Sequence, residues 1–441
     1  MLVSGRRLVL LLVLLAATGI PAAVLSATCA DGSCGDAVER AAPVPFCPLP
    51  AELRSRLVNG YREGRSPDVL GVANGTPVTS IADGGRTAWP GVSASSDGRV
   101  PLVYWGAGVA GTELPDGIGL DSIAPTVSEI LGFERPFPQV RSGGPTPGVA
   151  SGDRPKLVLL IAWKGVGSAE LETAGAVDRR FLSSLLDDGA GTLRADAGSI
   201  PLDPAATITT IGTGGLPSQH GITGSFVRND EGRVVEAFGF DAPVTVIATL
   251  ADDLDHAEPA SLVGAVLTDD LDRGIVGDGW YPEGDPVDAV IGDGATAPIA
   301  VEERLATGYG SDETPDILAV VLEGSMRSLD RLTHRIVATA ERATSNGTLV
   351  VVAGTGSRED DPTAIGDEDL VAAVEDAIPG DARSVEIAVP GGLFLDQDAL
   401  RREHVTGLAA VEAMRSAEGA EGRPILSDAF QGFAVSFGRY C

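Results

Sequence analysis

The residues best suited to chemistry gather in one stretch, Asp203–Gly224 (DPAATITTIGTGGLPSQHGITG). A carboxylate and several hydroxyls come first, and glycines that permit close backbone approach then lead to a proline that forces a turn. We expect Thr207–Gly215 to be a loop near a helix N-terminus, where amides and hydroxyls can bind an anion or a polar ligand. The candidate ligand-binding residues are Lys164, Asp203, Thr207, Thr209, Thr210 and Gly214.

The part Ile211–Ile222, IGTGGLPSQHGI, resembles the segment that follows the nucleophile in the alkaline-phosphatase-like superfamily. The similar branch is that of the nucleotide pyrophosphatases/phosphodiesterases, whose pattern reads roughly T-x-P-x-H-x-x-I-x-T-G-x-x-P-x-x-H-G-I. The second half of the pattern fits, whereas the nucleophilic threonine or serine falls on Pro204. The resemblance therefore implies a fold and does not imply an activity.

The same resemblance places the family's metal ligands on residues that do not bind metal. Hydrolysis in this superfamily uses two divalent ions, zinc or similar, held by aspartate and histidine. The first aspartate falls on Lys164, and a later Asp-His pair falls on Gly354 and Thr355. The D-x-x-x-H segment expected after Pro315–Leu322 and the late histidine expected within Gly91–Ser96 are absent from the sequence. We therefore expect no catalytic residue, no bound metal and no cofactor.

Lys164 is one of only two lysines in the chain. An ammonium group at a carboxylate position would repel a divalent ion, and it could pair with Asp203 instead. The alternative is an ordinary surface lysine in a loop.

The histidines offer one further cation site. His256 lies in an acidic segment, residues 252–259, which we expect to be a loop. It could bind a cation together with Asp253 and Asp255, although such loops are usually only solvated. The other histidines are expected to be structural or at the surface: His220, His334 and His404.

Long apolar strands that alternate with helices imply a mostly parallel sheet covered on both faces, a three-layer α/β/α sandwich. Helices are expected over Pro50–Tyr61, Leu120–Gly132, Ser328–Ala343 and Glu368–Ala377. Strands are expected over Val69–Val72, Val100–Trp105, Pro155–Gly165, Pro315–Leu322, Thr348–Gly356, Ser384–Phe394 and Phe433–Phe437.

The order of the segments is not that of the superfamily. Residues 45–137 resemble the family's C-terminal half, residues 138–154 are a Gly/Pro/Ser-rich linker, and residues 155–441 resemble the N-terminal half. The resemblance thus implies a circularly permuted alkaline-phosphatase-like domain over residues 45–441, because the ends of a compact domain are often close in space. The alternative is an unpermuted fold with coincidental matches.

The N-terminus is typical of an exported protein. Arg6 and Arg7 precede the apolar run Leu8–Ala17 and then small residues, the order of a secretory signal. We expect residues 1–27 to be a signal peptide, or an uncleaved membrane anchor, and residues 28–44 to be a flexible tether. The formal net charge of −30 argues against nucleic acid as a partner. An extracytoplasmic location, with an envelope protein or a small anionic ligand as partner, is the expectation.

The four cysteines are expected to form disulfides, since their number is even and the chain reads as exported. Three pairings are possible. The permutation leaves a cut between Cys441 and about Phe46, so we predict a Cys47–Cys441 bond that closes it and a local Cys29–Cys34 bond. By the chain-entropy relation, the long-range bond contributes roughly 4–5 kcal/mol.

Three functions fit these residues. The leading one is an exported pseudoenzyme that binds or scaffolds at the cell envelope. The second is a metal-dependent hydrolase of phosphate esters or diesters with a rearranged site that uses Asp203, Thr207 or Thr209. The third is an envelope interaction protein whose partner binds the acidic surface.

Overall fold

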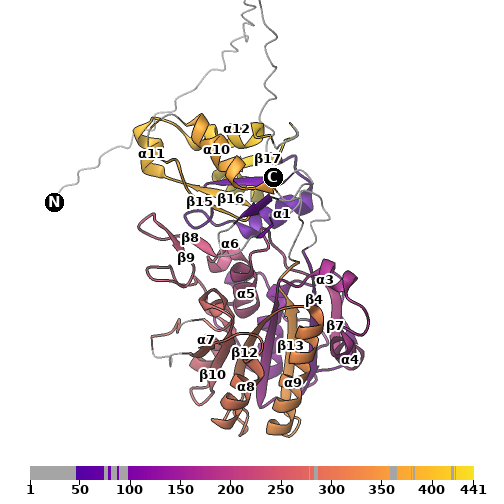
Figure 1. Ribbon diagram of the computed structural model, residues 1–441. Helices are drawn as coiled ribbons and strands as arrows, with labels where there is room; N and C mark the ends of the chain where they lie inside the picture. The colour runs from indigo at the N-terminus through magenta and orange to yellow at the C-terminus, as the bar shows by residue number, and fades with distance from the viewer. Residues whose placement is uncertain are drawn as a thin grey trace, which may run out of the picture. The chain divides into compact units, whose positions relative to one another are not determined.

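The computed structural model describes residues 46–73, 78–80, 87–88, 98–277, 279–282, 287–357, 365–378, 380, 383–418, 422 and 424–441. These residues belong to one compact unit, Pro45–Cys441 (Figure 1). The expected signal segment, tether, Cys29–Cys34 bond and Gly91–Ser96 position lie outside the described residues. None of the described helices has the length and apolar character needed to span a bilayer.

An eight-stranded sheet forms the centre of the unit. Its strand order is β11 (Asp288–Ile291), β10 (Val263–Leu267), β12 (Asp316–Glu323), β6 (Leu157–Lys164), β13 (Thr348–Gly354), β4 (Arg99–Gly106), β7 (Ala190–Asp196) and β5 (Thr112–Glu113). β4 is antiparallel to both of its neighbours, and the other pairs are parallel. The sheet is therefore mixed and mostly parallel.

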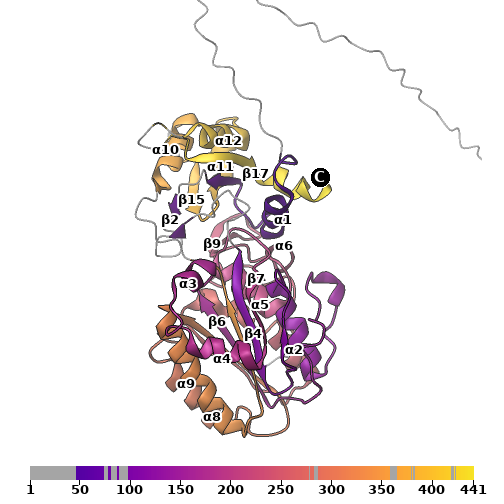
Figure 2. The same ribbon diagram turned by 90° about the vertical axis from the view of Figure 1, so that its right-hand side faces the viewer.

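The residues of β6 show how helices cover both faces of this sheet. Val158, Leu160 and Ala162 pack in one core with α2 (Ile123–Leu131), α5 (Pro204–Thr213) and α7 (Leu250–Ala257). The alternate residues pack in a second core with α4 (Arg180–Asp188), α8 (Ala297–Ala306) and α9 (Met326–Thr344). Because successive side chains of a strand point to opposite faces, the arrangement is three-layered, with α8 and α9 on one side and α2 and α5 on the other (Figure 2).

A smaller antiparallel sheet has the order β15 (Val385–Val389), β16 (Gly392–Leu395), β1 (Val69–Ala73) and β17 (Leu426–Gln431). Its apolar face packs with α10 (Glu368–Ala377), α11 (Gln397–Arg402) and α12 (Gly407–Ser416). The prediction of one strand over Ser384–Phe394 is wrong, because a turn at Pro390–Gly391 divides the segment into a hairpin. The predicted strand over Phe433–Phe437 is also wrong: it is helix α13 (Gly432–Phe437), and the last strand precedes it.

The remaining described elements are one further helix, α1, and a set of shorter helices and strands. They are α1 (Ala51–Gly60), β2 (Val78–Ser80), β3 (Thr87–Ala88), η1 (Leu120–Ser122), η2 (Pro138–Val140), α3 (Ser168–Thr173), α6 (Pro217–His220), β8 (Phe226–Arg228), β9 (Val234–Glu236), η3 (Asp270–Ile275), β14 (Ile365–Gly366) and η4 (Gly438–Tyr440). The helices predicted around α1, α2, α9 and α10 are confirmed, as are the strands predicted around β1, β4, β6, β12 and β13.

The predicted linker, residues 138–154, is packed against the protein and is not a free tether. The side chains of Thr146 and Val149 are buried, and Gly143 N donates to Gly214 O at 3.2 Å. Thr126 and Thr146 also join their hydroxyls at 3.0 Å. Its glycine and proline content indicated a segment without regular secondary structure. The buried side chains and hydrogen bonds show that part of this segment is nevertheless packed against the rest of the protein.

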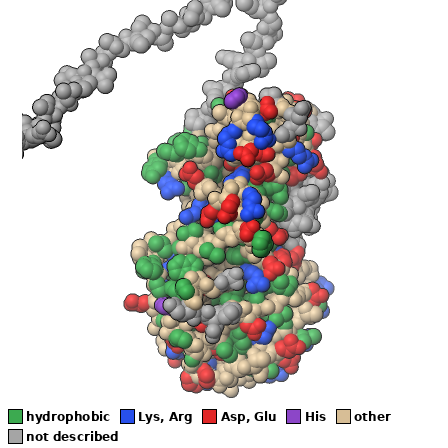
Figure 3. Space-filling view, turned by 90° about the vertical axis from the view of Figure 1, so that its left-hand side faces the viewer, with side chains coloured by type: hydrophobic (Ala, Val, Ile, Leu, Met, Phe, Trp, Pro, Cys, Tyr) green, Lys and Arg blue, Asp and Glu red, His purple; other side chains and the backbone are tan. Residues whose placement is uncertain are grey.

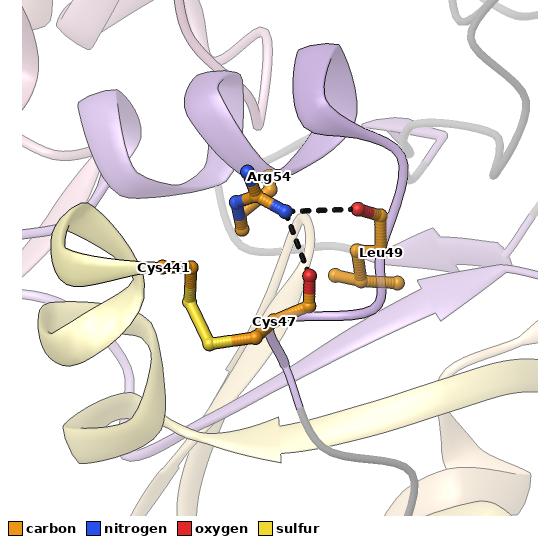
Figure 4. Close-up of a disulfide and its surroundings, with 4 residues drawn as sticks. All are labelled: Cys47, Leu49, Arg54 and Cys441. Carbon is orange, nitrogen blue, oxygen red and sulfur yellow. Dashed lines mark hydrogen bonds between the residues drawn. A yellow bond between two sulfur atoms is a disulfide. The ribbon is translucent and has the colours of Figure 1, made fainter.

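The predicted Cys47–Cys441 bond is present and joins residues 394 positions apart, with Cα atoms 5.3 Å from each other. Arg54 donates to Cys47 O and Leu49 O at 2.7 and 3.2 Å, which orders the segment that carries Cys47 (Figure 4). The Phe46 ring meets Phe430 edge-on at 5.1 Å. The bond therefore secures both ends of the described unit to one small core.

We expect the double variant Cys47→Ala/Cys441→Ala to lower the free energy of unfolding by about 4 kcal/mol, because the unfolded chain loses its largest constraint. A urea titration without reductant measures this. The matched control, Cys29→Ala/Cys34→Ala, should lower the unfolding free energy by no more than about 2 kcal/mol, since a bond between those residues would close a loop of only about six residues. Equal losses in both variants would contradict the prediction.

Candidate functional site

The parallel strands place their carboxyl ends at one edge of the central sheet, where α/β proteins commonly bind ligands. β6 ends at Lys164, β13 ends at Gly354, and Thr355 follows. Gly354 pairs with Trp163, and Thr355 N donates to Trp163 O at 3.2 Å. Three of the positions that the sequence singled out are thus brought together.

The side chain of Lys164 lies between two carboxylates. Its Nζ is 2.7 Å from Asp269 Oδ2 and 3.2 Å from Asp272 Oδ1. The Lys164 side chain is 10% exposed and that of Asp272 is 0% exposed. Thr268 holds the other oxygen of Asp272 through its backbone N at 2.9 Å and its hydroxyl at 2.5 Å. We call Lys164, Thr268, Asp269 and Asp272 the Lys164 cluster.

The suggested pairing of Lys164 with Asp203 is replaced by this cluster. Sequence reasoning missed Asp269 and Asp272, which are more than 100 positions from Lys164. The available signal was the run Thr268–Asp272, TDDLD, directly after the apolar strand β10. A polar run at the carboxyl end of a parallel strand lies at the same edge as the end of β6.

The single ammonium of the cluster faces two carboxylates. Burial opposes the charged form of Lys164, but Asp272 and Asp269 outweigh it and the pKa of Lys164 is raised. Burial raises the pKa of Asp272, and the ammonium of Lys164 acts against that shift. The cluster therefore holds one ammonium fixed between the buried carboxylate of Asp272 and the partly exposed carboxylate of Asp269.

The surroundings of Gly354 leave no space for a larger side chain, and the hydroxyl of Thr355 already accepts a hydrogen bond. A Cβ on Gly354 would lie 2.3 Å from Val166 O and 2.7 Å from Pro101 Cδ. An aspartate at this position would therefore displace backbone. The Thr355 hydroxyl is buried and accepts from Gly165 N at 2.9 Å.

The expected loop Thr207–Gly215 is wrong, because Pro204–Thr213 is the buried helix α5. Pro204 takes the first helical position, which suits a residue without an N–H. Asp203 is the N-cap: it accepts from Ala205 N at 2.9 Å, and from Ser225 N and Oγ at 2.8 and 3.0 Å. The carboxylate therefore orders the helix start.

The hydroxyls of α5 are turned to its own backbone. Thr207, Thr209 and Thr210 are buried, and each donates to the carbonyl four residues earlier, at 3.1, 2.7 and 3.2 Å. Gly214 is the left-handed C-cap at φ 71°. The structure therefore does not gather these candidate residues into a ligand loop.

His220 belongs to the same packed region. Its Nε2 is 3.1 Å from Thr210 Oγ1, and its Nδ1 accepts from Ile222 N at 3.2 Å. Complete burial lowers the pKa of His220 to about 3, so its imidazole is neutral near pH 7. Its contacts are those of a structural side chain.

The acidic segment that follows Thr249 is helix α7 and not the expected loop. Asp253 is completely buried and accepts from Arg135 Nε at 2.7 Å, Arg141 Nη2 at 3.1 Å and Tyr281 Oη at 2.8 Å. The His256 ring stacks on Tyr281 at 4.2 Å. Two guanidinium groups thus already neutralise the carboxylate that was considered for a cation. Within the described part of the chain, no three His, Cys, Asp or Glu side chains are grouped as metal ligands.

The fold and the site define an α/β protein with a mixed central sheet and a charge-paired cluster at its carboxyl edge. No protein-family model matches the chain, and no curated protein matches it. One solved structure that is weakly similar is phosphonoacetate hydrolase from Sinorhizobium meliloti 1021 in complex with phosphonoacetate. The identity is 16% and the TM-score 0.30, and the match covers 46% of this chain and 57% of that one, so the chain spans little more than half of its length. A score this low does not establish a shared fold.

We expect Lys164→Met to lower the free energy of unfolding by about 3–5 kcal/mol at pH 7, because Asp272 is then buried without its cation. The loss should shrink as the pH falls: without Lys164 the pKa of Asp272 rises further, and the protonated acid needs no cation. Urea titrations between pH 7 and pH 4 measure both effects.

The double variant Lys164→Met/Asp272→Asn supplies the control, since it removes both charges and should recover most of the loss. A Lys164→Met variant as stable as the parent at pH 7 would show that the cluster does not hold this edge of the sheet together.

Proposed function

We propose that the protein is an exported pseudoenzyme with a circularly permuted alkaline-phosphatase/phosphodiesterase-like fold, which acts by binding or scaffolding at the cell envelope. The observation that carries the proposal is the position of the Lys164 ammonium between Asp269 and Asp272. It stands at the strand end where the resemblance would put the first metal-binding aspartate.

Electrostatics makes this position unfit for a pair of dications. A divalent ion needs carboxylate or imidazole ligands, and a neighbouring ammonium raises the free energy of the bound state. The steric closure at Gly354 removes a second ligand position. A phosphoryl group would therefore lack the charge stabilisation that metal-dependent hydrolysis needs.

The permutation is supported by the place of β4. This strand comes from residues before the linker, and it lies inside the sheet between β13 and β7, which come from residues after it. The segment before the linker thus contributes an interior strand to the same sheet. The Cys47–Cys441 bond joins the two ends that a permutation would create.

Export is supported by this disulfide, since such bonds persist in oxidising compartments, and by the signal-like order that follows Arg6 and Arg7. The alternative of a rearranged hydrolase is less favoured. The hydroxyls of Thr207 and Thr209 already donate to the backbone of α5.

We expect the purified protein to hold less than about 0.1 zinc per chain and to hydrolyse bis(p-nitrophenyl) phosphate no faster than buffer containing zinc, because the expected ligand positions at the carboxyl edge of the sheet lack ligands for both ions. Metal analysis and absorbance of released nitrophenolate measure this. Lys164→Asp should also be inactive, since the other ligands are missing. Stoichiometric zinc with turnover in the parent protein would overturn the proposal.

A further inference from the structure

A pocket of about 390 Å³ opens beside α6, and its lining shares no residue with the Lys164 cluster. Its walls include Arg62, Phe137, Gln219, Val246, Trp280 and Tyr281. This volume lies in the range of pockets that bind small organic molecules, and a mostly apolar lining with few polar groups is typical of them.

The aromatic wall of the pocket is held in place by hydrogen bonds. Trp280 donates through Nε1 to Thr245 O at 3.2 Å and through its backbone N to Asp252 Oδ1 at 3.0 Å. Tyr281 donates to the buried Asp253, and its ring meets Trp280 edge-on at 5.0 Å. The wall is therefore preformed, which lowers the entropy lost on binding.

The mouth of the pocket keeps apolar side chains exposed. Phe137 is 61% exposed, Val246 is 41% and Trp280 is 40%. Phe137 also has a φ of 52°, a left-handed conformation that is strained for an aromatic residue. Hydrophobic side chains gather in patches on the face drawn in Figure 3. An apolar ligand body would remove such surface from water.

Arg62 supplies the polar group of the pocket. Its Nη1 donates to Ser218 O and Gln219 O at 2.8 and 3.3 Å, which fixes the guanidinium. Among the described residues, no carboxylate lies within ion-pair distance of Arg62. None of these residues accepts a hydrogen bond from its Nε or Nη2. Burial and the nearby Arg65 lower its pKa. An arginine with no carboxylate partner among the described residues is unexpected in a chain with a net charge of −30.

The other guanidinium of the lining differs in this respect. Arg141 donates to Thr213 O, Pro136 O, Ala248 O and Asp253 Oδ2. Arg141 shares the Asp253 carboxylate with Arg135, and each of its three nitrogens donates to an acceptor of the protein. Among the described residues of the lining, Arg62 is therefore the guanidinium better placed to take an external anion.

We propose that this pocket binds a small amphipathic organic anion. Its apolar, preferably aromatic, body would lie against Phe137, Val246 and Trp280, and its anionic group would accept from the Nε–Nη2 edge of Arg62. That edge presents two parallel donors, which match a carboxylate or a sulfonate. The inference does not depend on whether the Lys164 cluster is catalytically inactive.

Two probes of similar shape separate the charge from the apolar body: 8-anilinonaphthalene-1-sulfonate carries a sulfonate, and N-phenyl-1-naphthylamine does not. We expect the folded protein to bind the sulfonate probe at one site per chain, seen as a saturable rise in fluorescence. Arg62→Gln should weaken its binding about 10-fold or more, since a charge-assisted hydrogen bond is lost. Binding of the neutral probe should change less than about 2-fold.

Three further variants make the test specific. Val246→Trp narrows the mouth and should weaken both probes. Arg194→Gln removes an exposed arginine on β7 that pairs with Asp116, and should affect neither probe. Arg62→Lys keeps the charge without the paired donors, and should weaken only the sulfonate probe. If thermal unfolding shows that Arg62→Gln is misfolded, Arg62→Lys takes its place in the test.

The proposal is overturned if the sulfonate probe shows no saturable one-to-one binding. It is also overturned if the Arg62 substitutions affect both probes equally or neither, or if Val246→Trp leaves both affinities unchanged. None of these results depends on hydrolytic activity, so failure here is distinct from failure of the proposed function.

Discussion

The contact between the Lys164 ammonium and the buried Asp272 carboxylate decides how the carboxyl edge of the central sheet is interpreted. A buried carboxylate without a cation is costly, and so is a buried ammonium without an anion. Each therefore compensates the other, and the partly exposed Asp269 adds a second carboxylate to the same ammonium. At this strand end the charged groups therefore stabilise the protein internally.

Close packing of α5 against η3 places Asp272 where this contact can form. A Cβ on Gly274 would lie 1.9 Å from Thr209 Oγ1, and one on Gly212 would lie 2.3 Å from Gly274 O. Two glycines therefore let a helix and a 3-10 turn approach with backbone nearly in contact. The motif that resembles a phosphohydrolase loop thus serves as a packing surface, which explains why its threonines are buried.

Local patterns predicted the elements well where their apolar content was continuous. The strands that contain Leu157–Trp163 and Leu349–Ala353 were predicted because long apolar runs require burial on both faces. The threonine-rich helix was mistaken for a loop because β-branched hydroxyl residues disfavour isolated helices, and its stability comes from tertiary packing and the Asp203 cap. The partners of Lys164 could not be derived from spacing, since only the strand order brings residues 164 and 272 together.

Buried arginines of this protein pair with a carboxylate, whereas Arg62 is held by backbone carbonyl groups. This difference in environment indicates where an anionic ligand could bind. Arg135 and Arg141 share the buried Asp253 carboxylate, which also accepts from Tyr281, and the nitrogens of both guanidinium groups donate inside the protein. Arg62 is fixed by carbonyl groups, which orient a guanidinium without cancelling its charge. In a strongly acidic chain an uncompensated, oriented cation beside exposed aromatic rings favours an anionic ligand with an apolar body. The proposed absence of metal chemistry at one edge of the sheet is therefore compatible with a binding role at another place in the same unit.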